Sequence, residues 1–454
     1  MGAWTLDATA VELVADAGIL GAAMLVATLL RRYVPLLQRY LIPNALVAGA
    51  IGLVLGPELI DLVPISIERM GSYVYHLLAL TFICVGLRST PGKRSFAAFH
   101  LGFMQIMCML LQAMIGLSIM LLIYFLVDAS VSPAAGMLLT LGFGMGPGVA
   151  YSIGDSWSAF GFEEGGAVGL SLAAIGFLIA YVVGVAIVHR HGLANGSALP
   201  RSVRTGVRTS EERTVAGHLT LSPAAIEPLA FHLAMVAAIY GVTYLVVSGL
   251  AMGLESVGLA QEAPIVWSFH FILANLLALI ARRILTAAGG SSVLDDGLLD
   301  RLTGVMADYL IAASIMAISL GIAWRYALPI MLMAVLGTLV TYWALAFTSK
   351  RIFREYRFER FIGIFGEMTG TVTSGLALIR ILDPEYKSPV AQDLVLASGI
   401  ALALGFPLLV LINLPFTAFG GRIEGFFVLF GLLAAYFLLI MLAWRIYYSR
   451  SSGA

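Results

Sequence analysis

Two glycine-rich stretches interrupt long apolar runs of this chain and carry much of its polar chemistry. The first is GFGMGPGVAYSIG, from Gly142 to Gly154, and the second is FGEMTGTVTSG, from Phe365 to Gly375. In a helix interior each Gly costs about 1 kcal/mol relative to Ala, and each Pro about 3 kcal/mol. The sequence therefore predicts a break in the helical backbone at both places.

Such breaks offer two kinds of binding group inside an apolar surrounding. The N-terminal end of a half-helix carries roughly +0.5 charge and free N–H groups, which suit a carboxylate. Unwound carbonyls and neighbouring hydroxyls suit Na⁺. The alternative is that the glycines only let two helices pack closely, but the four glycines from Gly142 to Gly148, with Pro147 among them, favour a break.

The candidate substrate-binding residues lie in or directly after these breaks. They are Gly144, Met145, Gly146, Pro147, Gly148, Tyr151, Ser152, Gly366, Glu367, Thr369, Gly370 and Arg380. The second break also contains a dense run of hydroxyls, which supplies the candidate Na⁺ ligands Thr371, Thr373 and Ser374. No cofactor is expected besides Na⁺ as a coupling ion.

Charged side chains inside apolar runs are costly and commonly functional. Arg380 either clamps a carboxylate with two nitrogens or pairs with Asp383 or Glu385 near the membrane surface. Glu367 either joins a cation site or accepts a proton. Asp155 joins a cation site, accepts a proton, or lies in water at the mouth of the first stretch.

The composition is that of a membrane protein. The 454 residues are 60% hydrophobic and only 11% charged, whereas a soluble domain carries about 25% charged residues. The 26 basic and 26 acidic residues cancel, so nucleic acid is not an expected partner. Cys84 and Cys108 lie in apolar runs and are expected to be core residues. The sequence has no nucleophile–base set and no metal-ligand spacing that would indicate an enzyme.

Apolar runs of about 17–25 residues predict eleven membrane spans in an all-α protein. The spans cover about 11–30, 42–55, 72–87, 97–127, 165–188, 225–247, 265–280, 302–324, 327–347, 390–414 and 426–444. Two re-entrant hairpins are expected at 133–160 and 361–382. The predicted organisation is a first five-helix repeat over 11–188, a cytoplasmic linker over 189–221, a second five-helix repeat over 222–415, and an accessory helix and tail over 416–454.

The distribution of basic residues predicts the topology. With the N-terminus outside and the C-terminus in the cytoplasm, only Arg69, Arg325 and Arg422 of the 26 Lys and Arg residues fall in outside loops. The first hairpin then enters from outside and the second from inside, so the two halves are inverted. Inverted repeats with broken helices are typical of secondary transporters.

Four segments resemble the bacterial sodium/glutamate symporter family over about Ala17 to Pro415. They are YLIPNALVAGAIG, ALTFICVGLRS, GFGMGPGVAYSIGDSW and GTVTSGLALIRILDPEYKSP. The resemblance implies a homodimeric carrier of the bacterial inner membrane that couples Na⁺ to glutamate uptake by alternating access. By position, Gly144, Gly146 and Gly148 match the family's first glycine-rich loop, and Gly366 and Gly370 match its second.

The chain departs from the family inside both loops. The family carries a His and a Thr in the first loop, where this chain has Met145, Pro147 and Val149, and a Pro-Thr pair in the second loop is matched by Thr373-Ser374. The eleventh span is also additional. The expected function is Na⁺-coupled symport of glutamate or a related small carboxylate; H⁺-coupled or exchange transport of another organic acid, and an ion channel, are the alternatives.

Overall fold

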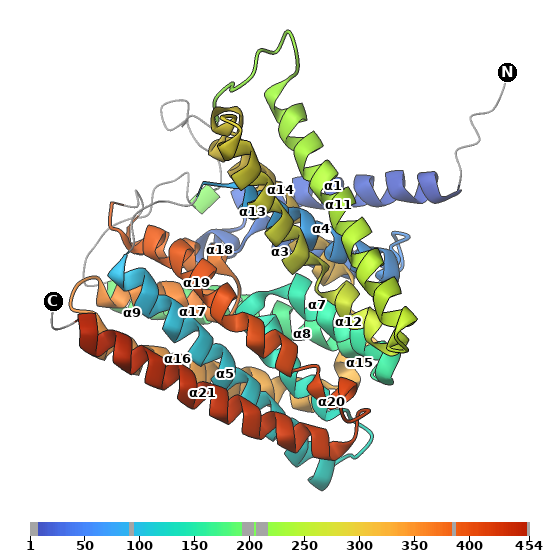
Figure 1. The fold of residues 1–454 in the computed structure, drawn as a ribbon, viewed down its shortest axis with the longest axis vertical. Coiled ribbons are helices and arrows are strands. Elements are labelled where there is room, and N and C mark those ends of the chain that lie inside the picture. Colours follow the sequence, from blue (N-terminus) through green and yellow to red (C-terminus); the bar gives the residue numbers. More distant parts are fainter. Residues whose placement is uncertain (1–7, 90–94, 193–203, 206–216, 384–386, 452–454) are drawn as a thin grey trace. The chain divides into compact units, whose positions relative to one another are not determined.

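A computed structural model of the protein describes residues 8–89, 95–192, 204–205, 217–383 and 387–451. These residues form helices and connecting turns, without a strand among them (Figure 1). Nine helical segments in this part of the chain are long and apolar enough to cross a membrane. They are Val11–Tyr33, Ile67–Leu87, Phe96–Leu126, Gly165–His191, Pro228–Ser256, His270–Ala287, Ala327–Ile352, Val390–Thr417 and Ile423–Tyr448. The protein is therefore a multi-span helical membrane protein.

Two of the eleven expected spans are not among these nine. The second corresponds to α3 (Asn44–Leu55), whose 12 residues cover about 18 Å, less than the roughly 30 Å apolar thickness of a bilayer. The other corresponds to α14 (Asp296–Met316), which carries Asp296, Asp300, Arg301 and Asp308.

Two expected spans are wrong as continuous helices. The run 265–280 is divided at Phe269 between α12 (Ala263–Ser268) and α13 (His270–Ala287). The run 302–324 is interrupted after Met316, and α15 (Leu320–Arg325) follows. The carboxylate of Glu58 accepts a hydrogen bond from the Leu320 N–H at 2.7 Å, which favours a new helix start there because acidic groups stabilise helix N-termini.

The chain forms two compact units. Unit 1 comprises the described parts of 1–89, 201–247 and 270–320, and unit 2 those of 90–200, 248–269 and 321–454. Each predicted half contributes to both units, and the two interruptions lie where the chain passes from one unit to the other. Most of the predicted linker 189–221 lies outside the described residues.

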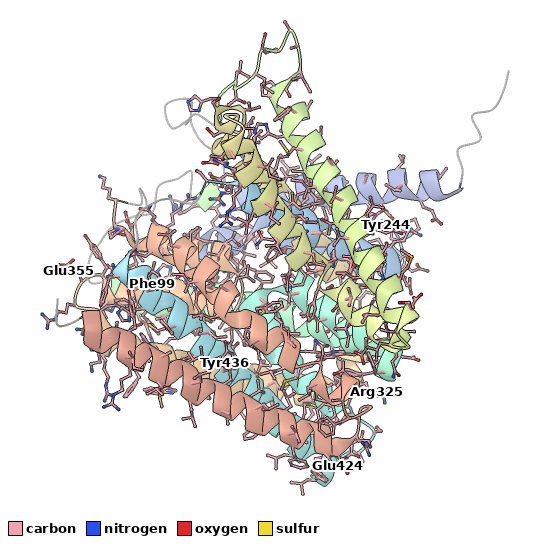
Figure 2. The ribbon with its side chains drawn as sticks, in the orientation of Figure 1. Phe99, Tyr244, Arg325, Glu355, Glu424 and Tyr436 are labelled. Carbon is pink, nitrogen blue, oxygen red and sulfur yellow. The ribbon has the colours of Figure 1, made fainter. Side chains whose placement is uncertain are left out.

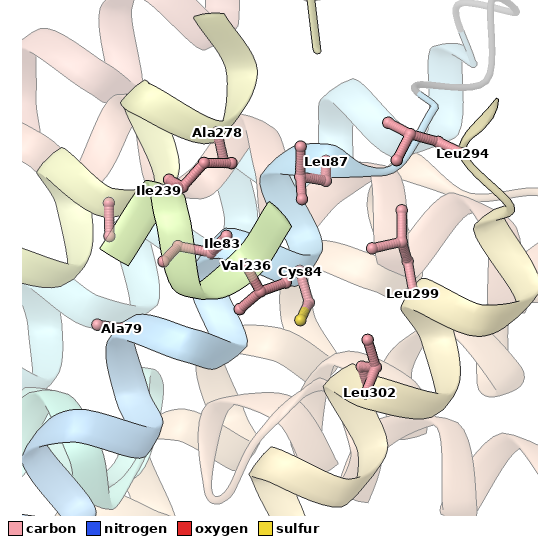
Figure 3. Packing of buried hydrophobic residues seen from close by; sticks show 11 residues of the cluster. Ala79, Ile83, Cys84, Leu87, Val236, Ile239, Ala278, Leu294, Leu299 and Leu302 are labelled. Carbon is pink, nitrogen blue, oxygen red and sulfur yellow. The ribbon is translucent and has the colours of Figure 1, made fainter. Parts of the chain in front are cut away.

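Unit 1 is organised around α4 (Ile67–Leu87), which packs against α13 and α14. Figure 3 shows the buried side chains that α4 shares with its neighbours. They include Ile83, Cys84 and Leu87 of α4, Val236 and Ile239 of α11 (Pro228–Ser256), Ala278 of α13, and Leu299 and Leu302 of α14. On α1 (Ala8–Tyr33) the buried Asp16 pairs with Arg69 at 2.7 Å. This ion pair joins α1 to α4.

Unit 2 is organised around α5 (Phe96–Leu126), which packs against α16 (Ala327–Ile352), α19 (Val390–Leu411) and α21 (Ile423–Ser451). The 31 residues of α5 span about 46 Å. We call the end of unit 2 near Ser95 the first end and the end near Asp128 the second end. In Figure 2, Phe99 and Glu355 mark the first end, and Arg325 and Glu424 mark the second.

The last helix, α21, is held to the centre of unit 2 by polar as well as apolar contacts. Trp444 donates its indole N–H to His100 Nδ1 at 2.7 Å, and the Tyr436 hydroxyl donates to the Leu404 carbonyl at 2.5 Å. The ring of Tyr447 stacks on that of Phe99. These contacts position α21 on α5 and α19.

Candidate functional site

The first glycine-rich stretch breaks at Gly146. We call the segment around it, from Pro133 to Phe160, the first broken segment. It begins with η1 (Pro133–Met137), α6 (Leu138–Thr140) and the π-helical turn η2 (Leu141–Met145). After Gly146 it continues as α7 (Pro147–Ser156) and η3 (Trp157–Phe160). Gly146 has φ +86°, a conformation that Gly adopts without the steric cost of a Cβ. Pro147 follows at the first position of α7, where its missing N–H is not needed.

Both ends of this first broken segment lie at the second end of unit 2. The hydroxyl of Tyr326 is hydrogen-bonded to the backbone of Ser132, just before the segment. The ring of Tyr326 also packs against Phe162, just after it. Glu164 and Arg325, their neighbours, form an ion pair at 2.5 Å. The segment therefore returns to the end from which it came.

The second glycine-rich stretch is a tight helical hairpin. Its arms are α17 (Arg357–Met368) and α18 (Val372–Leu382), joined by Thr369 to Thr371. A Cβ placed on Gly375 would lie 2.4 Å from the carbonyl oxygen of Gly363, and one on Gly363 would lie 2.7 Å from Ile379 Cδ1. Glycine is thus required at Gly375 because the backbones of the two arms approach too closely there for a side chain.

Both ends of this hairpin lie at the first end of unit 2. Near its start, Arg360 pairs with Asp393 at 2.9 Å, and Asp393 in turn accepts a hydrogen bond from Ser95, the residue that caps α5. At its finish, Asp383 accepts hydrogen bonds from the backbone N–H groups of Lys387 and Ser388, just before α19. The two broken segments therefore penetrate unit 2 from opposite ends.

The tips of the two segments meet inside unit 2. A Cβ placed on Gly146 would lie 3.0 Å from Thr371 Cγ2 and 4.0 Å from the Gly370 carbonyl oxygen. One placed on Gly176, in α8 (Gly165–Leu178), would lie 2.4 Å from the Thr369 carbonyl oxygen. Both breaks, which lie in different halves of the sequence, thus form one region.

Two helix N-termini converge in this region, and neither is capped by a side chain. Gly146 precedes α7 and Thr371 precedes α18; the Thr371 hydroxyl is 2.7 Å from that of Thr373 instead of bonding the helix. The first helical hydrogen bonds are those of Ala150 and Gly375, back to Gly146 and Thr371. The N–H groups and partial positive charges of both helices favour an anion beside them.

Buried oxygen atoms without hydrogen-bond partners lie around the same tips. Gln112 of α5 donates to the Met368 carbonyl at 2.8 Å and to the Thr341 hydroxyl at 2.9 Å, while its Oε1 has no donor within the described residues and faces Gly144. The fully buried Ser374 hydroxyl, beside Gly370, is likewise without a partner in that part of the chain. Buried acceptors without a hydrogen-bond donor are unusual in proteins, so a ligand or a water molecule is expected to bind them.

Glu367, at the last turn of α17, lies in a polar cluster with Gln105 of α5 and Ser398 of α19. Its side chain is 5% exposed. One carboxylate oxygen accepts a hydrogen bond from Gln105 Nε2 at 2.6 Å, and the other is 2.5 Å from Ser398 Oγ. Glu367 directly precedes Met368, whose carbonyl oxygen accepts the hydrogen bond from Gln112.

Several predicted site residues have structural partners away from the tips. Ser152 donates to the Ser268 carbonyl at 2.9 Å, and Tyr151 packs against α8 beside Gly166. Gly366 lies against Leu378 and the backbone of Gly375. Gly148 is buried in the first turn of α7, and the side chain of Met145 lies near Gly405 of α19.

Two predicted charged residues lie far from the tips. Asp155 is exposed near the end of α7, about 13 Å along the helix axis from Gly146. Arg380 is half-buried in the last turn of α18, about 13 Å along that axis from Thr371. Glu385, one of its expected partners, lies outside the described residues.

Sequence reasoning missed four polar residues that contact the second hairpin or its immediate partner, namely Gln105, Gln112, Thr341 and Ser398. A signal for two of them was present. Gln105 and Gln112 are two turns apart on one face of a largely apolar 31-residue helix, and polar side chains at such depth mark functional surfaces.

A separate cavity of about 260 Å³ lies between α5, α16 and α21. Its lining is almost entirely apolar and includes Met104, Leu345 and Phe437. It offers no group that would bind a carboxylate, so the region of the two tips is the better candidate site.

Comparisons of the chain with protein-family models, with curated proteins and with solved structures return no match. The resemblance to sodium/glutamate symporters therefore stays a prediction.

Proposed function

We propose that this protein is a secondary active transporter that carries a small organic carboxylate across the membrane by alternating access. The observation that carries the proposal is the meeting of the α7 and α18 N-termini, which approach from opposite ends of unit 2 and have no side-chain caps. Two such ends together present free N–H groups and about one unit of positive charge to a carboxylate. Half-helix N-termini bind anionic groups in this way in transporters with broken helices.

The two broken segments are, in this proposal, re-entrant hairpins of two inverted repeats. The repeats correspond to 11–188 and 222–415, with 416–454 as an accessory helix and tail. The opposite directions from which the segments penetrate unit 2 support this assignment, since inversion of one repeat relative to the other produces that arrangement. On the basis of the resemblance to sodium/glutamate symporters, we propose in addition that the protein is a homodimer in the bacterial inner membrane.

An amino acid fits the region better than a simple carboxylic acid. A carboxylate would lie at the two helix N-termini, and an ammonium group needs acceptors near them. The unpaired oxygens of Gln112 and Ser374 are such acceptors, because ammonium has only donors to offer. This supports glutamate or a related amino acid as the substrate.

Two coupling ions have separate support. Na⁺ is supported by the resemblance and by the hydroxyls of Thr371, Thr373 and Ser374 at the start of α18. H⁺ is supported by the buried carboxyl group of Glu367, which has no cationic partner within the described residues.

The test is transport by the purified protein in liposomes. Labelled L-glutamate, L-aspartate and succinate are offered under an inward Na⁺ gradient, an inward proton gradient, and no gradient with unlabelled substrate inside. We expect gradient-driven accumulation of at least one amino acid and its exchange without a gradient. Absence of both for every probe, with the protein folded, contradicts transport of these compounds, and single-channel conductance would point to a channel.

A further inference from the structure

We propose that Glu367, held by Gln105 and Ser398, carries a coupling proton through the transport cycle. The inference rests on the proposed function and specifies its coupling ion. The proton comes from water on one side of the membrane, binds a carboxylate oxygen of Glu367, and returns to water on the other side. No other bond is made or broken.

Glu367 is buried without a counter-charge, since it forms no ion pair among the described residues. Its side chain is 5% exposed, and its two carboxylate oxygens contact the neutral side chains of Gln105 and Ser398. Asp393, which is 4% exposed in the same unit, is paired with Arg360 at 2.9 Å. A buried carboxylate is strongly disfavoured without a cation or a proton, and only Asp393 has its cation.

The hydroxyl of Ser398 has too few hydrogens for its two contacts unless Glu367 is protonated. Ser398 Oγ lies 2.5 Å from Glu367 Oε1 and 3.0 Å from the carbonyl oxygen of Leu394. A serine hydroxyl has one hydrogen, and neither a carboxylate nor a carbonyl can donate. A proton on Glu367 satisfies both contacts, because the carboxyl group then donates to Ser398 and Ser398 donates to Leu394.

The cluster also suits the deprotonated form of Glu367. The hydroxyl of Ser398 can then turn from the Leu394 carbonyl to the carboxylate, while Gln105 Nε2 keeps its bond of 2.6 Å to the other oxygen. Each protonation state has a consistent set of donors and acceptors, and the change moves one hydrogen bond on α19. A group that carries a proton reversibly needs both states to be accessible.

Other titratable and charged groups on the elements packed against α17 have different positions or partners. Cys108 of α5 contacts Thr341, His100 is bonded by Trp444, and His191 of α9 (Gly184–Gly192) stacks on Phe358. On α18, Ile379, the residue before Arg380, packs on Gly363, which is about one turn further from the tip than Glu367. The other titratable or charged residues on α17 and on the elements packed against it are Tyr124, Tyr181, His189, Arg190, Tyr342, Lys350, Arg351, Arg357 and Glu359. The described neighbours that do bond Glu367 are the neutral Gln105 and Ser398.

The position of Glu367 links the proton to the substrate region. The next residue, Met368, has its carbonyl bound by Gln112, and the hairpin tip follows directly. Gln105 and Gln112 lie on the same face of α5, so one helix contacts both the proton-carrying cluster and the tip. Protonation changes the charge at the last turn of α17 and thereby the electrostatic potential that an anionic substrate meets at the tip.

The experiment uses the full-length protein in liposomes without Na⁺, with the membrane potential clamped by K⁺ and valinomycin. An inward gradient of one pH unit accumulates labelled L-glutamate about tenfold if one proton moves per substrate. We expect this for the wild type. Glu367→Gln should abolish accumulation and keep the exchange of labelled for unlabelled glutamate, because a neutral amide mimics the protonated state. Asp155→Asn, which removes an exposed acid of the other hairpin, should accumulate like the wild type.

Two outcomes overturn the inference while leaving the proposed function intact. One is proton-driven accumulation by Glu367→Gln, and the other is wild-type accumulation that follows a Na⁺ gradient and ignores pH. A readout independent of transport is the infrared carbonyl band of a protonated carboxylic acid during a pH titration. A titrating band that Glu367→Gln removes supports the inference, and its absence from the wild type overturns it even if none of the transport probes is a substrate.

Discussion

At the scale of single residues, Gly146 has the strictest requirement in the candidate site. Its φ of +86° with ψ 175° lies in a region that is essentially confined to glycine and costs an L-residue about 1–3 kcal/mol, and a new methyl group would press on Thr371 at 3.0 Å. We therefore expect Gly146→Ala to lose glutamate uptake while the protein still folds. Uptake by liposomes containing equal amounts of folded protein measures this.

Gly161 provides a control at a second glycine of positive φ. It has φ +89° and ψ 11°, in the left-handed helical region, and a Cβ there would meet nothing within 4 Å. Gly161→Ala thus places alanine at a positive φ without the contact at the tips, and it should retain uptake. Equal loss in both variants would assign the effect to the positive φ and remove Gly146 from the site.

Gln112 belongs to the residue scale as well, because one side chain connects α5 to the tip. Gln112→Met keeps the volume but removes two hydrogen bonds and leaves the buried Met368 carbonyl unpaired, which costs about 1–3 kcal/mol. We expect a higher KM for glutamate and a lower melting temperature. Ser118→Ala on the same helix removes a hydrogen bond to the Met114 carbonyl only, and its KM should stay that of the wild type.

The residue scale also shows how far the sequence could predict the site. Gly and Pro have local conformational preferences, so the breaks at Gly146 and Gly370 could be predicted from the chain itself. The partners Gln105 and Glu367 are separated by 262 residues, and nothing in the local sequence of either indicates the other. Ser152 could not be recognised as a structural residue, because its acceptor, Ser268, is 116 residues away.

At the scale of elements, apolar run length predicted most helices but not their interruptions. The first broken segment has the expected limits, Pro133 and Phe160, and the second starts at Arg357 rather than at residue 361. The interrupted residues themselves, Phe269 and 317–319, include no Gly or Pro. The interruptions depend on where the chain leaves one unit for the other, which is a property of tertiary packing.

The close contact between α17 and α18 gives a prediction about the hairpin as an element. In Gly375→Ala the new methyl group would lie 2.4 Å from the Gly363 carbonyl oxygen and 2.9 Å from Leu394. Because the nearest atom is backbone, the arms must separate, at a cost of about 1–3 kcal/mol. We expect a clearly lower melting temperature in detergent and reduced uptake.

Gly399 on α19 is the control for the hairpin prediction. A Cβ there would meet nothing within 4 Å, and Ala is the better helix former by about 1 kcal/mol. Gly399→Ala should melt at or above the wild-type temperature. A Gly375→Ala variant as stable as this control would show that the arms tolerate separation and that their contact does not stabilise the hairpin.

At the scale of the whole molecule, composition alone predicted a multi-span helical protein, and nine suitable helices are present in the described residues. The division into two units could not be predicted, since each unit combines segments from both halves of the chain. Both glycine-rich breaks lie in unit 2, although their sequence positions suggested one in each half. Folding of distant segments into the same unit is therefore what creates the candidate site.

The orientation of unit 2 across the membrane is the last prediction. The scarcity of basic residues near the second end indicates that this end is outside, so the first broken segment opens outward and the second inward. Ser130, whose N–H donates to Asp128, is exposed at the second end, and Glu355 is exposed at the first end. The native Cys84 and Cys108 are buried and give little background. In intact cells a membrane-impermeant maleimide should label Ser130→Cys and should label Glu355→Cys only after permeabilisation. Labelling of both from the same side would show that the long central helix α5 does not cross the bilayer, and the opposed approach of the two hairpins would then have no relation to the two sides of the membrane.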